Sequence, residues 1–377
     1  MIIKIIKIIL SKRIERMIPI DPIKAKKKYE LYGINNRLYK LLSLYLKLEI
    51  DTIVYDDFFE SDVKINNRTS FNYFNYIIQW ERPLDALEIL NNYFYSKKIS
   101  SVKKISHCKP LYINNIECSE KLLPIIYRMK TISIIMTVFN EESLFLRSLE
   151  SIFNQTYVNF HVIVVDDAST DSTPVILKEA KSLYKDKLTI ITLKENQGTY
   201  IAKNIALTYA KGDLIAFQDA DDWSHPQRIA EHVKLHNNNV LFSFSKLVRI
   251  TNEGLFFSKH IYPLDRLSMV SLMIDKKIID EIGFFRKLRI GSDTEYFERI
   301  KRFTSYKFHR IDKVLMLCAH KSNSLTTSPN TGVESFGISS IRNHHRNRWN
   351  TWHTKLKKSR RKPYVSFDRS IYSYSIL

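Results

Sequence analysis

Residues 214–222 read LIAFQDADD, an apolar run that ends in three carboxylates. A short apolar run bounded by polar residues is typical of a buried β-strand. Alternate residues of an extended chain point the same way, so we expect Asp219 and Asp221 to face one point just beyond the strand. Carboxylates that converge repel one another unless a cation lies between them, and a few hard oxygen ligands suit Mg²⁺ or Mn²⁺. Taken alone, so short a motif is better interpreted as an acidic, solvated turn.

The residues before this stretch alternate strand and helix patterns, beginning at Thr131. Strand-like apolar runs are followed by segments with helical apolar spacing, and the strand-like runs cover residues 131–138, 161–165 and 188–193. Such alternation at short intervals predicts right-handed βαβ units and an α/β fold with a mostly parallel central sheet.

Polar residues suited to a ligand follow three of the four predicted strands. They are Thr137 with Asn140 and Glu141, then Asp166–Asp167, and then Asp219–Asp222. In parallel sheets the ligand crevice lies beyond the carboxyl ends of the strands, so the topology brings these groups to one edge. This coincidence favours a binding site over a set of solvated turns.

The part of the chain after the acidic motif adds two strand patterns and one acidic helix start. Residues 240–250 and 314–317 are strand-like. Asp293 and Glu295 open a predicted helix. Acids in a first helical turn commonly act only as partners of the helix dipole, and this interpretation applies with particular weight to Glu295.

Four regions follow from these patterns. Residues 1–18 form a basic amphipathic segment, 19–130 a mainly helical accessory region, 131–330 the α/β domain, and 331–377 a basic, aromatic C-terminal tail. Within the tail, residues 342–362 contain many Lys and Arg, no acid, and Trp at helical spacing. That composition fits a helix at an anionic membrane surface, a single-stranded nucleic-acid contact, or a partly ordered solvated tail.

Composition limits the partners and the compartment. The 377 residues carry a net charge of +20, which indicates anionic partners without identifying them. The three cysteines match no zinc spacing and predict reduced thiols. No window has the length and apolarity of a membrane span, and no signal-peptide cleavage site follows residues 1–10. We expect a cytoplasmic protein, peripheral at the inner face of the cytoplasmic membrane.

Six segments between residues 131 and 327 resemble a known enzyme family in order and spacing. They read ISIIMTVFNEESLFLRSLESIFNQTY, VIVVDDASTDST, ENQGTYIAKNIAL, IAFQDADDWSHPQRI, IGSDTEYFERI and AHKSNSLT. This text is similar to family 2 glycosyltransferases of the GT-A type, in the group that builds bacterial capsule, O-antigen and related surface glycans. The resemblance covers about half of the chain and is specific for the family, but not for the sugar.

The resemblance implies roles for named residues. It places Thr137, Phe139, Asn140 and Glu141 around the nucleotide and gives Asp166 or Asp167 the base edge. It implies further donor contacts from Lys203, Asp219 and Ala220, a metal site formed by Asp219, Asp221 and His320, and a general base at Asp293 with Glu295 in reserve. The sequence departs from the family at Thr137, where Pro is frequent, and at Ser292, where Glu is common before the base.

The implied reaction is the inverting transfer of a sugar from a nucleotide-diphosphate donor, a UDP-sugar in our interpretation, to a hydroxyl of a growing surface glycan. The implied partners are that donor, Mn²⁺ or Mg²⁺, and a glycan or lipid-linked glycan acceptor, with an anionic membrane surface contacted through 1–18 and 342–362. We expect no nucleic acid. Whether transfer stops at one addition or repeats stays open.

Two alternatives from other classes stand beside this interpretation. A nucleotidyltransferase can share the sheet and the metal, but it normally has a basic, Gly-rich loop after the first strand, where this chain reads FNEES. A non-catalytic protein that binds nucleic acid or membrane would explain the net charge, but it would not explain acids gathered at strand ends.

Overall fold

The computed structural model describes residues 86–125, 130–237, 239–257 and 266–321, the single residues 324 and 328, and residues 333–334 and 337–377. The chain forms two compact units. The larger one contains Val102–Leu247, Arg266–Ala319 and Ser340–Leu377, and the other contains Met1–Ser101, Val248–Asp265 and His320–Ser339. The predicted segment 1–18 and most of the predicted accessory region lie outside the described residues.

Four parallel strands form the centre of the sheet in the larger unit. They are β3 (Ile132–Val138), β4 (Phe160–Asp166), β5 (Leu188–Leu193) and β6 (Leu214–Asp219). β3 pairs with β4 on one side and with β6 on the other, and β4 pairs with β5. Because all four strands run the same way, the acids that follow β4 and β6 reach the same edge of the sheet. The predicted α/β fold is confirmed.

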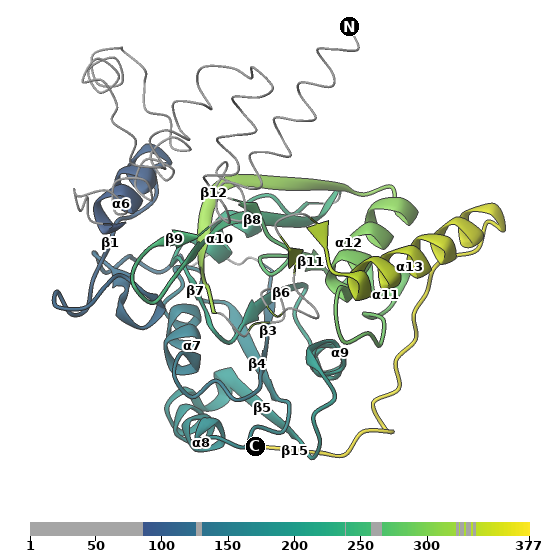
Figure 1. The fold of residues 1–377 in the computed structure, drawn as a ribbon, viewed down its shortest axis with the longest axis horizontal. Helices are drawn as coiled ribbons and strands as arrows, with labels where there is room; N and C mark the ends of the chain where they lie inside the picture. The colour runs from purple at the N-terminus through teal and green to yellow at the C-terminus, as the bar shows by residue number, and fades with distance from the viewer. Residues whose placement is uncertain are drawn as a thin grey trace, which may run out of the picture. The chain divides into compact units, whose positions relative to one another are not determined.

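Alternate residues of these strands enter two separate cores. Ile135, Ile163 and Ile191 pack with residues of α9 (Thr199–Tyr209), α11 (Lys277–Ile282) and α12 (Ser292–Phe303). The neighbouring strand residues pack with α7 (Phe145–Phe153), α8 (Thr173–Tyr184) and α10 (Arg228–Val233). Helices therefore cover both faces, which explains why these strands read as continuous apolar runs. Figure 1 shows α7 and α8 on one side of β3–β5 and α9 on the other.

The sheet is mixed, because antiparallel strands flank the parallel centre. Its order is β15-β5-β4-β3-β6-β11-β8-β12-β7. β11 (Met273–Asp275) pairs antiparallel with β6 and with β8 (Val240–Ile250), and β12 (Lys307–Ala319) pairs antiparallel with β7 (Asp222–Ser224). The last predicted strand, 314–317, is the buried part of β12. Smaller elements of this unit are β1 (Val102–Lys103), η1 (Ile113–Asn115), β2 (Glu117–Cys118), η2 (Lys185–Lys187) and β10 (Arg266–Leu267).

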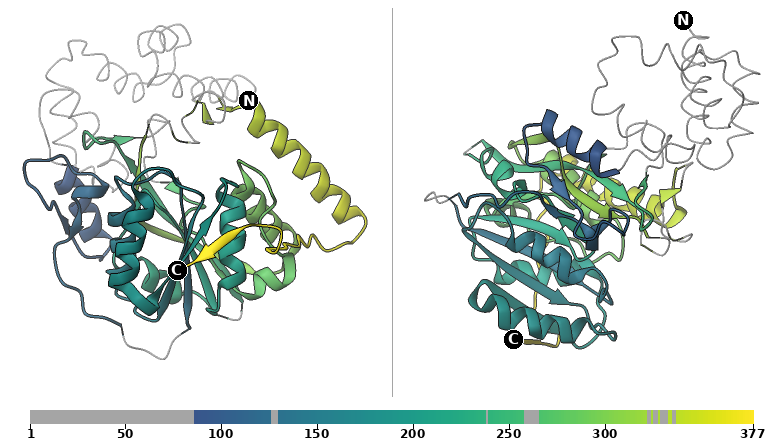
Figure 2. Two further views of the ribbon diagram at one scale, coloured as in Figure 1. Left: turned by 90° about the horizontal axis from the view of Figure 1, so that it is seen from below. Right: turned by 90° about the vertical axis from the view of Figure 1, so that its left-hand side faces the viewer.

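The C-terminal segment is an ordered part of the larger unit. α13 (Ser340–Lys358) packs on α12, and β15 (Tyr374–Ile376) adds an antiparallel strand to β5 (Figure 2). Between them, Val365 forms backbone hydrogen bonds to Ile282 and Phe284. The interpretation of this segment as a partly ordered solvated tail was therefore wrong, since it contributes a helix and a sheet strand. None of the helices within the described residues is long and apolar enough to cross a membrane.

The described parts of the other unit are few. They comprise α6 (Ala86–Ser96), the end of β8 paired with β9 (Phe256–Phe257), His320, and the short strands β13 (Val333–Glu334) and β14 (Gly337–Ile338). His320 donates its backbone N–H to the carbonyl of Ile250 at 2.9 Å, and its ring stacks on Phe257 with 3.6 Å between centroids.

Gly283 provides a test of how the C-terminal segment is attached. It has φ +75° and ψ −149°, which only glycine adopts readily, and an added Cβ would overlap the carbonyl oxygen of Val365. We expect Gly283→Ala to lower the free energy of unfolding by roughly 3 kcal/mol and to release residues 363–377. Urea denaturation and limited proteolysis measure the two effects.

Gly291→Ala is the control. Its φ is +74°, but ψ is 12° and no atom lies within 4 Å of the added Cβ, so we expect a loss of about 1 kcal/mol without faster proteolysis. Equal behaviour of the two variants would contradict the described attachment.

Candidate active site

The end of β6 carries a paired carboxylate. Lys203 Nζ on α9 lies 3.1 Å from Asp219 Oδ1, and the lysine is nearly buried while the Asp219 side chain is 36% exposed. The ammonium lies near the rings of Tyr200 and Phe217, 5.9 and 6.0 Å from their centroids. Within the described part of the chain Asp219 Oδ2 has no partner, so this oxygen is available to a ligand.

A buried arginine fixes the end of β6 through hydrogen bonds. Arg228 is completely buried and donates to Gln218 Oε1 at 2.6 Å, to Ser224 Oγ at 2.8 Å and to the carbonyl of Phe217 at 2.6 Å. Burial lowers its pKa to about 10, so it remains charged at neutral pH. Ser148 Oγ donates to the carbonyl of Asp219 at 2.9 Å. These contacts fix the backbone on which the acidic motif lies.

The two acids after β4 have different environments. Asp167 accepts the backbone N–H groups of Gln197 and Gly198, each at 2.7 Å, which fixes both of its oxygens against the start of α9. Asp166 accepts the N–H of Ser169 at 3.0 Å, and its buried Oδ2 has no hydrogen-bond partner in the described part of the chain. Burial is the main cause that raises the pKa of both carboxyls.

The loop after β3 is fastened to the loop after β4. Asn140 adopts φ +50°, accepts the N–H of Thr170 at 2.8 Å on its Oδ1, and donates its own N–H to Ser169 at 2.9 Å. Glu141 donates its N–H to Thr173 Oγ1 at 3.0 Å. Thr137 is nearly buried, with its hydroxyl 2.8 Å from that of Thr199, whereas the side chain of Phe139 is 48% exposed.

The predicted base stands at the start of α12 and contacts α9. Tyr200 donates its hydroxyl to Asp293 Oδ1 at 3.0 Å. Tyr200 is the residue whose ring lies beside Lys203, and Lys203 pairs with Asp219. The structure therefore brings Asp219, Lys203 and Asp293, which lie far apart in the sequence, into one connected cluster.

The other residues of the acidic motif are placed differently. Ala220 is buried in the core with α7 and α10, and Asp222 is buried and accepts the N–H of Ala319 at 3.2 Å. Asp222 thus ties β7 to β12, so a ligand-facing role does not suit it. Asp221 is half-buried at the turn between β6 and β7.

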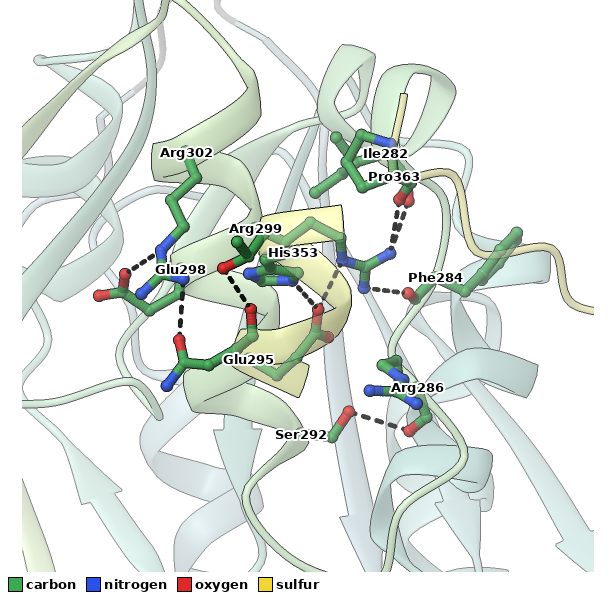
Figure 3. Close-up of polar contacts among 12 residues, drawn as sticks. Ile282, Phe284, Arg286, Ser292, Glu295, Glu298, Arg299, Arg302, His353 and Pro363 are labelled. Carbon is green, nitrogen blue, oxygen red and sulfur yellow. Dashed lines mark hydrogen bonds and ion pairs between the residues drawn. The ribbon is translucent and has the colours of Figure 1, made fainter. Parts of the chain in front are cut away.

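Glu295 does not suit the reserve role of general base that we assigned to it. Its side chain is completely buried, with Oε1 lying 3.1 Å from Arg299 Nε and 2.8 Å from His353 Nε2 of α13 (Figure 3). Arg299 in turn donates to the carbonyls of Ile282, Phe284 and Pro363. A carboxylate enclosed in this way cannot reach a substrate hydroxyl, and it joins α12 to the C-terminal segment instead.

The predicted metal site has few protein ligands in the described part of the chain. Among the described residues, no three His, Cys, Asp or Glu side chains gather closely enough to hold a metal ion by themselves. Mg²⁺ and Mn²⁺ at phosphate sites commonly take only one or two carboxylates, and the substrate phosphates and water complete the shell. Asp219 Oδ2 and Asp221 fit that smaller requirement. The part of His320 remains a prediction.

Two residues of this region were not predicted from the sequence as site or scaffold groups. Tyr200 lies within a helical pattern that marks it as an ordinary helix residue. Arg289 is exposed in the loop before α12 and donates to Asn196 Oδ1 at 2.7 Å, next to the backbone held by Asp167. A local pattern gives no signal for such contacts, because each partner comes from a distant part of the chain.

Two Glu–Arg pairs on α12 allow a matched test of the buried cluster. The Glu295–Arg299 pair is fully buried, whereas the Glu298–Arg302 pair, at 2.9 Å, is partly exposed. Glu295→Gln should destabilise the protein by roughly 3 kcal/mol, because it leaves a buried guanidinium without its carboxylate. Glu298→Gln should lose less than about 1 kcal/mol. Urea denaturation of both variants checks the difference, and equal losses would contradict the burial described here.

Comparison with known proteins identifies the family. The family model "Glycosyl transferase family 2" matches residues 133–297. An uncharacterised glycosyltransferase from Methanocaldococcus jannaschii is 30% identical over 210 residues, which cover 49% of this chain and 69% of the relative. The Escherichia coli UDP-Glc:alpha-D-GlcNAc-diphosphoundecaprenol beta-1,3-glucosyltransferase WfaP is 36% identical over 120 residues, 31% of this chain and 46% of the relative.

A further relative and a solved structure are also similar to this chain. An uncharacterised glycosyltransferase from Rickettsia bellii is 31% identical over 181 residues, which cover 45% of this chain but only 26% of that protein. A solved mannosyltransferase from Pyrobaculum calidifontis gives a TM-score of 0.43 at 19% identity, covering 61% of this chain and 74% of that one. On the family model and the Methanocaldococcus relative, the chain belongs to glycosyltransferase family 2, and its α/β domain is of the GT-A type.

Proposed function

We propose that this protein transfers a sugar, with inversion, from a UDP-sugar to a hydroxyl of a growing surface glycan. The observation that supports this most directly is the cluster in which Asp219, Lys203, Tyr200 and Asp293 are joined by polar contacts of 3.0 to 3.1 Å and a ring–ammonium contact. The name of the Escherichia coli relative specifies a UDP-sugar donor and a lipid-diphosphate acceptor, and this supports the same classes here.

The leaving-group side of the reaction is assigned to the end of β6. A divalent cation, Mn²⁺ or Mg²⁺, when bound there with the donor, neutralises charge on the departing diphosphate. Asp219 and Asp221 would hold it, and Lys203 keeps Asp219 oriented through its contact with Oδ1. Lys203 also adds positive charge near the phosphates.

The acceptor side is assigned to Asp293. A single displacement needs one carboxylate that takes the proton of the attacking hydroxyl while the bond from the sugar to the diphosphate breaks. Oδ2 of Asp293 accepts no hydrogen bond from the described part of the chain, so it can receive that proton. The new glycosidic bond then forms on the sugar face opposite the leaving group.

The nucleotide is assigned to the joined loops after β3 and β4. Phe139 offers an exposed ring for stacking, and Asn140 and Glu141 lie on a backbone held by several hydrogen bonds. Asp166 and Asp167 remain the candidates for the base edge. Thr137 and Ala220 are nearly buried, so we assign them to the walls of this region.

The exposed face of α13 is assigned to an anionic membrane surface at the cytoplasmic side. Trp349 and His353 are buried against the catalytic unit, and Trp352 lies under the guanidinium of Arg286 at 5.0 Å, so the aromatic side is used for packing. Arg346, Lys355 and Lys358 of α13 are exposed and basic, and the exposed Arg360 and Arg361 follow directly after the helix. Electrostatic contact with lipid headgroups, without insertion of Trp, follows from this division.

The enzymatic proposal is tested with a panel of UDP-glucose, UDP-N-acetylglucosamine, UDP-galactose and GDP-mannose. Release of nucleoside diphosphate in the presence of Mn²⁺ is expected for at least one UDP-sugar and should be lost on chelation. Asp221→Ala and Asp293→Asn should each lower kcat by at least about 100-fold. Asp186→Ala, an exposed acid far along the sequence from both, should not change it. Turnover that survives in Asp293→Asn would remove the base assignment.

The membrane assignment is tested by sedimentation with vesicles of phosphatidylglycerol and phosphatidylcholine. Lys355, Lys358 and Arg361 changed together to Gln should weaken binding by roughly 100-fold, since each basic residue near an anionic surface contributes about 1 kcal/mol. Lys178, Lys185 and Lys187 changed together to Gln serve as a charge-matched control and should bind normally. Equal weakening by both triple variants would show that net charge, and not α13, governs binding.

A further inference from the structure

The hydrogen bonds of Asp293 are unequally divided between its two oxygens. Oδ1 accepts the hydroxyl of Tyr200 at 3.0 Å, the backbone N–H of Thr294 at 2.8 Å and the hydroxyl of Thr294 at 3.5 Å. Oδ2 has no such contact within the residues that the structure describes. One oxygen is thus held while the other is available, an arrangement suited to a base that must keep a fixed direction.

Tyr200 can hold this carboxylate because its own position is fixed. The side chain is 8% exposed and packs on Phe285, with 5.8 Å between ring centroids. Phe285 packs in turn on Tyr296 at 4.3 Å and on Phe217 at 5.5 Å. Tyr296 lies on α12 itself, so the same aromatic group supports the tyrosine and the helix that begins with Asp293.

The phenol of Tyr200 also remains a donor under all ordinary conditions. Burial, followed by the charge of Asp293, raises its pKa well above 10. The charged groups that face it are Asp293 from α12, Asp219 from β6 and Lys203 from its own helix. A deprotonated phenol would lie between two carboxylates, so only the neutral, hydrogen-donating form is compatible with this site.

We propose that Tyr200 is a positioning residue for the general base: its hydroxyl fixes Asp293 through Oδ1, so that Oδ2 is held in place to receive the acceptor proton. The inference rests on the proposed function, because it presupposes that Asp293 is the base. The competing explanation is that Tyr200 only fills the core next to Phe285. A purely packing role predicts a change in stability but no change at the carboxylate of Asp293 and no loss of kcat.

Tyr200→Phe removes the hydroxyl and keeps the ring, so it separates these two roles. Tyr209→Phe is the matched control, because Tyr209 lies on the same helix and its hydroxyl contacts Tyr374 at 2.9 Å, away from the acids. The first measurement needs no substrate. Protein labelled with ¹³C at aspartate carboxyls is measured by NMR at pH 7, and the Asp293 resonance is assigned by its loss in Asp293→Asn.

Tyr200→Phe removes one hydrogen-bond donor from Asp293 Oδ1, so the carboxyl resonance of Asp293 should shift in this variant. Tyr209→Phe should leave the resonance where it is in the unaltered protein. An unchanged resonance in Tyr200→Phe overturns the proposal, whatever the variant does to stability.

The second measurement uses the UDP-sugar that is turned over in the panel described above. Tyr200→Phe should lower kcat by about 10- to 100-fold with little change in the KM of the donor. If Asp293→Asn remains active, the proposed base fails and this proposal fails with it. If Asp293→Asn is inactive and Tyr200→Phe keeps its kcat, only the positioning role fails.

Discussion

The site depends on how one helix compensates charges that would otherwise repel one another. The start of α9 supplies partners to three carboxylates from three elements: backbone N–H groups of Gln197 and Gly198 to Asp167, Lys203 to Asp219, and Tyr200 to Asp293. These partners are of three kinds: backbone N–H groups, an ammonium group and a phenol hydroxyl. A buried carboxylate without a partner is strongly disfavoured, so the acids and α9 have to be positioned together. The chemistry proposed for this protein uses the oxygen atoms that this arrangement leaves available.

The topology explains why α9 can reach all three. The strand order β5-β4-β3-β6 requires the connection from β5 to β6 to pass over β4 and β3, and α9 packs on both of these strands. Its first turn consequently lies near the carboxyl end of β4, and Lys203, one turn further, lies near the end of β6. Asp293 comes from a later part of the chain. It lies at the start of α12, which packs in the same core as α9. A right-handed crossover, the usual one for parallel strands, thus places the charge partners where the ligand edge needs them.

The amino-acid pattern predicted the parallel core closely but could not predict long-range partners. The runs 188–193, 214–219 and 240–250 are strands with those bounds. Polar residues at both ends of a continuous apolar stretch limit where the buried strand can begin and end. Asp219 and Asp293 were placed on chemistry and family resemblance, and the structure brings them into one cluster. Glu295 illustrates the limit: its position in a first helical turn suggested an accessible acid, whereas its true environment depends on His353, which lies 58 residues later. The helical spacing of Trp in residues 342–362 was visible in the sequence, but it could not show that Trp349 is buried and that Trp352 lies under Arg286.

α12 is held at two places, and one of them is the C-terminal segment. Its first turn carries Asp293, which contacts Tyr200, and Glu295 in the same turn contacts Arg299 and His353 of α13, while Arg299 also donates to the carbonyl of Pro363. A helix moves as a rigid body, so a shift at Glu295 or Arg299 displaces the carboxylate of Asp293. Reaction geometry tolerates little such movement, since an error of about 1 Å can reduce the rate 100-fold. The C-terminal segment therefore contributes to the position of the proposed base, because without it the buried Glu295–Arg299 pair loses its cover.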